Sequence, residues 1–153
     1  MLHDYPQTVL RAAAIGLELT PQTSDVTPPP RILIIEDELL IALMIEEICR
    51  AAGYRVSGVA YTVKMARDEL AKRNFDAVLL DISVGGKRYP ESADRLMAEG
   101  IPFGFVTGYD YLVEPRHGKI PVLQKPFTPV QLRGLLKTLV GPGSSTSDVV
   151  QTA

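Results

Sequence analysis

Apolar and polar positions follow two alternating periods along residues 31 to 140. Short aliphatic runs, each with the composition of a buried strand, lie at 31–36, 55–61, 77–81, 102–107 and 121–124. Apolar residues recur every three or four positions in four other stretches, which predicts amphipathic helices at 38–52, 63–73, 91–99 and 128–140. In the helix at 91–99, we expect Leu96 and Met97 to face the core. The segment after 102–107 is polar and broken by proline, so we expect any helix there to be short or irregular.

This alternation indicates an α/β fold with a parallel sheet. Parallel strands need long crossover connections, and helices in those connections cover both faces of the sheet, giving three layers. Right-handed crossovers bring the C-terminal ends of the strands to one edge, where ligands of such folds bind. We therefore expect functional side chains to follow directly after the strands.

The two ends of the chain differ in composition from the middle. Residues 1–30 contain an amphipathic stretch and end in PQTSDVTPPP, whose prolines exclude a helix or a central strand. Residues 141–153, GPGSSTSDVVQTA, have the composition of a flexible tail. We expect an N-terminal extension with a linker over 1–30, one domain over 31–140, and a tail over 141–153.

Composition limits the classes of partner. The 153 residues are 46% hydrophobic and 22% charged, which suits one folded core, and the net charge of -2 provides no basic field for binding nucleic acid. The single cysteine, Cys49, cannot form an internal disulfide and fits a reducing compartment. No apolar stretch is long enough to cross a bilayer and no export signal is visible, so we expect a cytoplasmic protein with no membrane partner.

Five residues at the expected strand ends carry the candidate chemistry. Glu36 and Asp37 follow the first strand, Asp81 the third, Thr107 the fourth and Lys125 the fifth. Crowded carboxylates repel one another and favour a divalent cation with oxygen ligands, which indicates Mg²⁺. A lysine and a threonine beside them can hold an anion. Such a set can move a phosphoryl group onto an aspartate, and we interpret Asp81 as the acceptor.

The motifs LIIEDE, VLLDIS, FVTGY and LQKPF, in this order, make residues 31–140 resemble the receiver domain of two-component response regulators. The resemblance implies a flavodoxin-like (βα)5 fold with strand order 2-1-3-4-5. It also implies Mg²⁺-dependent phosphorylation of Asp81 by a phosphohistidine partner. Asp37, Asp81 and the main-chain carbonyl of Ser83 would bind the metal, with Glu36 acting mainly through water. The implied protein is a bacterial, single-domain phosphorelay component that catalyses only its own phosphorylation and dephosphorylation.

Two features depart from the common receiver pattern. Val122 stands three residues before the lysine, where receivers commonly carry Phe or Tyr as the switch partner of the threonine. The segment GFVTGYD and the proline-broken stretch after it are similar to the FAT GUY subfamily of receivers. That similarity implies a poorly formed fourth helix and a sensor histidine kinase of the HWE or a related type, or a histidine phosphotransfer protein, as partner. Phosphorylation would then order residues 108–118.

Alternative functions stay open at this point. The chain could be a pseudo-receiver adaptor that is never phosphorylated, although the full set of site residues argues against this. An aspartate-nucleophile phosphatase is disfavoured because Ser83 stands where that chemistry needs a second aspartate. A homodimer is also left open.

Three further expectations concern residues around the site. We expect Glu38 to be only a solvated helix start and His117 to be an exposed loop residue. The apolar residues at the start of the first helix would dock a partner kinase, unless a neighbouring segment buries them: Leu39, Leu40 and Leu43.

Overall fold

The computed structural model describes residues 27–88, 90–108 and 113–143. The expected N-terminal extension lies almost entirely outside the described residues, as does most of the expected tail. Within the described ranges, no helix is long and apolar enough to cross a membrane.

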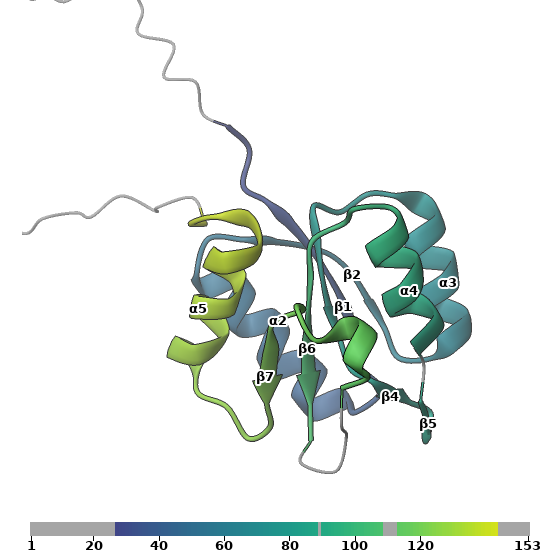
Figure 1. Cartoon of the computed structure of the whole chain (residues 1–153). Coiled ribbons are helices and arrows are strands. Elements are labelled where there is room, and N and C mark those ends of the chain that lie inside the picture. The colour runs from purple at the N-terminus through teal and green to yellow at the C-terminus, as the bar shows by residue number, and fades with distance from the viewer. Residues whose placement is uncertain (1–26, 89, 109–112, 144–153) are drawn as a thin grey trace, which may run out of the picture.

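A five-stranded parallel sheet forms the centre of the fold (Figure 1). Its strands, in the order in which they lie side by side, are β2 (Arg55–Ala60), β1 (Arg31–Ile35), β3 (Ala77–Leu80), β6 (Phe103–Thr107) and β7 (Val122–Gln124). Every neighbouring pair is parallel. The predicted α/β class and the strand order 2-1-3-4-5 are confirmed, with β6 and β7 as the fourth and fifth strands of the sheet.

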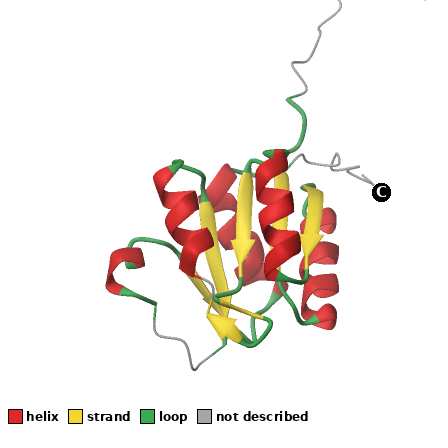
Figure 2. Cartoon of the chain, turned by 90° about the vertical axis from the view of Figure 1, so that its right-hand side faces the viewer, coloured by secondary structure: helices red, strands yellow, loops and turns green. Residues whose placement is uncertain are grey.

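Helices cover both faces of this sheet. The pairs α2 (Leu39–Ala51) with α5 (Pro129–Val140), and α3 (Val63–Lys72) with α4 (Pro90–Ala98), lie on opposite sides (Figures 1 and 2). Successive side chains of a strand point to opposite faces. Ile32 and Ile34 accordingly pack in the core under α2 and α5, whereas Leu33 and Ile35 pack in the core under α3 and α4. Burial on both faces explains why the strands appear in the sequence as continuous aliphatic runs.

Local signals in the sequence fix where two of the helices begin. The Thr62 hydroxyl accepts a hydrogen bond from Met65 N at 3.1 Å and caps α3. Thr128 and Gln131 form a capping box at the start of α5, where Pro129 occupies the first turn. The sheet and these helix starts together hold the strand ends, and the loops that follow them, in fixed positions.

The described part of the connection from β6 to β7, residues 108 and 113–121, contains no α-helix. Of its described residues, only Pro115–His117 are helical, as the 3₁₀ helix η1. The expectation of a short or irregular fourth helix is thus confirmed for the described part of this connection. Residues 109–112 lie outside it.

Two details near α4 differ from expectation. The glycine-containing loop after β3 is a small antiparallel hairpin, β4 (Ser83–Val84) and β5 (Lys87–Arg88), whose turn places Gly85 and Gly86 at φ 65° and 71°. These positive φ values suit glycine and explain both residues. The expectation that Met97 faces the core is wrong, because its side chain is exposed. The neighbouring Leu96 is buried, as expected.

Candidate functional site

The predicted site residues meet at the C-terminal edge of the sheet because backbone pairing continues past the strands. Glu36 N donates to Ala60 O at 3.0 Å, Asp81 N to Ile35 O at 2.9 Å, and Lys125 N to Thr107 O at 2.7 Å. These bonds fix the main chain at three of the residues. In Figure 1 the strands run toward the edge that carries the β4–β5 hairpin, away from residues 27–30.

The ammonium group of Lys125 lies at the centre of three carboxylates. Its Nζ is 2.6 Å from Glu36 Oε2, 3.0 Å from Asp81 Oδ2 and 3.2 Å from Glu38 Oε1. Glu36 and Asp81 are buried, and Lys125 is largely so. The structure therefore brings Lys125 and Asp81 into direct contact.

Burial and charge act against each other within this cluster. Loss of solvation raises the pKa of Glu36 to about 7, although hydrogen bonds from Lys125 and from the Glu38 backbone oppose the rise. Burial lowers the pKa of Lys125, but hydrogen bonds to Glu36 and Asp81 outweigh it, so the net shift is upward. Lys125 is consequently a permanent cation at neutral pH, surrounded by more acidic groups than it can neutralise.

The oxygen atoms at this edge suit a hard divalent cation. Glu36, Glu38 and Asp81 each offer a carboxylate oxygen, and these atoms lie within 4.8 Å of one another. Asp37 lies outside this group, and its Oδ2 accepts a hydrogen bond from Gly85 N at 2.8 Å. Asp81 Oδ1 accepts one from Ser83 N at 3.0 Å. The metal-binding roles expected for Asp37 and Ser83 stay predictions.

Thr107 contributes an unused donor at the end of β6. It is buried, and its Oγ1 has no hydrogen-bond partner among the described residues. A buried hydroxyl without a partner is costly, so such groups are uncommon in folded proteins. The hydroxyl is therefore available to a ligand that enters the site.

The expectation for Glu38 is incomplete. Glu38 does begin α2 and its side chain is 64% exposed, but its carboxylate makes no capping hydrogen bond and contacts Lys125 instead. A third acid at the same strand end as Glu36 was the sequence signal for this role.

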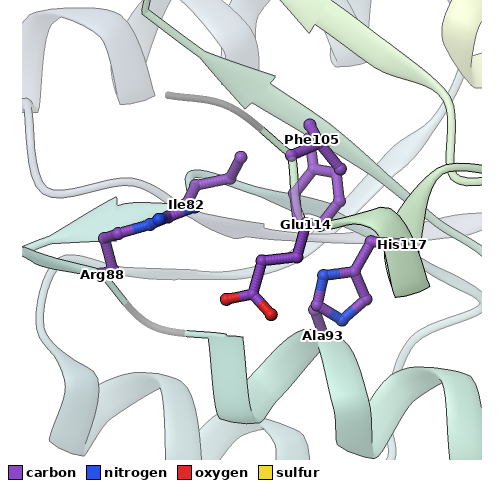
Figure 3. A pocket seen from close by; sticks show the side chains of 7 residues that line it. Ile82, Arg88, Ala93, Phe105, Glu114 and His117 are labelled. Carbon is purple, nitrogen blue, oxygen red and sulfur yellow. The ribbon is translucent and has the colours of Figure 1, made fainter. Parts of the chain in front are cut away.

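The expectation for His117 is wrong, because its side chain is buried. His117 Nε2 lies 2.8 Å from Asp94 Oδ1, and the centroid of its ring lies 5.8 Å from the centroid of the Phe105 ring. Figure 3 shows His117 beside Glu114 in a narrow cavity that Ile82, directly after the acceptor candidate, also lines. The cavity has about 10 Å³ of free space, enough for roughly one water molecule. The side chains that line it are therefore closely packed.

Exposed apolar side chains lie on α2 and β7. Leu39, Leu40 and Leu43 are 56%, 80% and 47% exposed, so no described residue covers them fully. Val122, at the position of the usual switch aromatic, is 47% exposed.

Comparisons with known proteins give consistent results. No protein-family model matches the chain. The phyllosphere-induced regulator PhyR of Methylorubrum extorquens is 34% identical over an alignment of 113 residues that covers 69% of this chain and 41% of that protein. The chain thus spans about two-fifths of the length of this curated relative.

Solved structures are similar over most of the described fold. The solution structure of SdrG from Sphingomonas melonis Fr1 is 36% identical, covers 74% of this chain and 98% of its own, and has a TM-score of 0.67. The response regulator REC domain of Erythrobacter litoralis PhyR is 27% identical, covers 77% and 95%, and has a TM-score of 0.64. A BeF3-activated conformation of SdrG is 39% identical over 72% of this chain and 96% of its own, with a TM-score of 0.60.

Proposed function

The chain belongs to the receiver domains of response regulators, and on this basis we propose that Asp81 accepts a phosphoryl group from a phosphohistidine in a Mg²⁺-dependent reaction. The contact of 3.0 Å between Lys125 Nζ and Asp81 Oδ2 is the observation that carries this proposal. The phosphorylated chain signals through conformational change and protein contacts in the cytoplasm. It serves as a signalling component, and its only catalysis is its own phosphorylation and dephosphorylation.

The transfer requires few groups from the protein. A carboxylate oxygen of Asp81 forms the new P–O bond, the P–N bond to the donor imidazole breaks, and the imidazole nitrogen keeps the electron pair. Lys125 offsets the negative charge of the phosphoryl oxygens, and the free Thr107 hydroxyl donates a hydrogen bond to one of them. Both groups reach the phosphoryl group from the same side of β3, because Thr107 ends β6 and Lys125 follows β7, and these two strands lie in order beyond β3 in the sheet.

Mg²⁺ fits the donor set at this edge. Three carboxylates face one ammonium, so the cluster carries excess negative charge that a divalent cation would balance. Glu36, Asp37, Asp81 and the Ser83 carbonyl are the groups that would hold the ion, Glu36 mainly through water. When bound, the ion supplies positive charge to the transferring phosphoryl oxygens.

The expected partner is a sensor histidine kinase of the HWE or a related type, or a histidine phosphotransfer protein. The irregular connection between β6 and β7 supports placing the chain in the FAT GUY subfamily. The exposed leucines at the start of α2 lie next to the site and supply an apolar surface for the partner's helices: Leu39, Leu40 and Leu43.

Phosphate incorporation from a small phosphodonor tests the proposal. Acetyl phosphate with Mg²⁺ should label the wild-type chain, and chelation of the metal should abolish labelling. The Asp81→Asn variant should take up no label, whereas the Asp68→Asn variant, altered at an exposed aspartate of α3, should be labelled like the wild type. Labelling of Asp81→Asn would contradict the assignment of the acceptor. A wild-type chain that takes up no label would support the adaptor function instead.

A further inference from the structure

The Lys125 ammonium group is crowded by carboxylates in the unphosphorylated chain, and it donates hydrogen bonds to Glu38 Oε1 and Asp81 Oδ2. An ammonium group carries three N–H donors, and three carboxylates lie within 3.2 Å of Nζ: those of Glu36, Glu38 and Asp81. A phosphoryl oxygen on Asp81 therefore competes with these three carboxylates for the Lys125 ammonium group. Which contact breaks therefore affects how easily the phosphorylated state forms.

Two of the three contacts are held in place by the surrounding structure. The Glu36 side chain is 1% exposed, and its Oε1 accepts a hydrogen bond from Glu38 N at 3.0 Å. Asp81 is 6% exposed, and its Oδ1 is held by Ser83 N. Breaking either contact would leave a buried carboxylate without its counter-charge, which is costly.

The third contact is the one that water can replace. The Glu38 carboxylate is 64% exposed, lies farthest from Nζ, and makes no capping hydrogen bond to α2. Exposed ion pairs contribute little to stability because water solvates the separated charges well. Glu38 is thus the group that Lys125 can release at the lowest cost.

We infer that Glu38 is a positioning residue that restrains the Lys125 ammonium until a phosphoryl group arrives and then releases it. This inference rests on the proposed phosphorylation of Asp81. Glu38 acts through Lys125 and need not touch the phosphoryl group itself. Removing the Glu38 charge should therefore favour the phosphorylated state only when Lys125 is present.

Binding of beryllofluoride, a phosphoryl analogue, in the presence of Mg²⁺ provides the test on the full chain. The Glu38→Gln variant should bind the analogue about twofold to fivefold more tightly than the wild type. The Glu47→Gln variant is the matched control, because it removes the same charge from an exposed position in the third turn of α2, and its affinity should be unchanged.

A double-mutant cycle with Lys125→Met separates the inferred role from simple charge repulsion. In the Lys125→Met background, Glu38→Gln should have no effect on the affinity for beryllofluoride. An equal tightening in that background would mean that Glu38 repels the anion directly and would overturn the inference. So would the absence of any effect when Lys125 is present.

A second measurement needs no bound analogue. The ¹⁵N resonance of the Lys125 ammonium group in the metal-free chain should shift in Glu38→Gln and stay in place in Glu47→Gln. An unchanged resonance in Glu38→Gln would show that the contact is absent, and the inference would fail. A wild-type chain that binds no beryllofluoride contradicts the proposed function itself, whereas normal wild-type binding without a Lys125-dependent effect contradicts only the role of Glu38.

Discussion

Replacing Thr107 by valine should stabilise the unphosphorylated chain and weaken its phosphoryl site. Valine matches the shape of threonine but lacks the hydroxyl, and the hydroxyl of Thr107 is buried without a partner among the described residues. A buried polar group without a hydrogen bond costs roughly 1 to 3 kcal/mol. We expect Thr107→Val to raise the free energy of unfolding by about 1 kcal/mol, since some of this cost is relieved by local adjustment.

Thr62→Val is the matched control. It makes the same chemical change at a threonine whose hydroxyl does have a partner, Met65 N at 3.1 Å, and caps α3. Loss of such a cap costs about 1 kcal/mol. The two substitutions should therefore change stability in opposite directions, by a difference of roughly 2 kcal/mol. Urea denaturation of the metal-free chain measures both values.

The same variant should bind the phosphoryl analogue more weakly. A hydrogen bond to a charged oxygen contributes roughly 1.5 to 3 kcal/mol, so Thr107→Val should lower the affinity for beryllofluoride with Mg²⁺ by about tenfold or more. Thr62→Val should leave that affinity unchanged. If Thr107→Val destabilises the chain as Thr62→Val does, the hydroxyl is already paired in the unphosphorylated state, and the reasoning is refuted.

Two further predictions concern charged groups near the site. The raised pKa of Glu36, from 4.5 to about 7, means that the folded chain holds this proton more tightly than the unfolded chain, so the stability of the metal-free protein should fall by roughly 3 kcal/mol as the pH rises from below 4.5 through 7. Glu36→Gln should remove this part of the pH dependence of urea denaturation, and identical pH profiles for the two chains would contradict the shift. Asp94 pairs with both Arg116 and His117, so Asp94→Ala should speed amide exchange over residues 115–120 by about fivefold. Asp68→Ala should leave exchange there unchanged, and an equal response to both would show that Asp94 does not hold this segment.

The sheet and its edge could be predicted because they depend on patterns that the sequence displays directly. Strands buried on both faces appear as aliphatic runs, such as Ala77–Leu80, and parallel topology then places the residues after them at one edge. The meeting of Asp81 and Lys125, 44 residues apart, follows from this topology alone.

Features that depend on contacts between distant segments could not be predicted. His117 is buried against Phe105, and its Nε2 lies 2.8 Å from Oδ1 of Asp94, 23 residues earlier in the chain; nothing beside His117 in the sequence signals these contacts. The β4 and β5 strands have two residues each, too few for a period to show. Helix α4 has nine residues, too short an apolar pattern to separate the buried Leu96 from its neighbour Met97, and the prediction that Met97 faces the core was therefore wrong.

Locating the phosphoryl group after reaction with a small phosphodonor tests the central claim most directly. Borohydride reduces an aspartyl phosphate to homoserine, and mass spectrometry of peptides from the treated chain identifies the modified residue. We predict homoserine at position 81, formed only when Mg²⁺ was present during the reaction with the phosphodonor. Modification at any other residue, or at Asp81 in the absence of a divalent cation, would contradict the account.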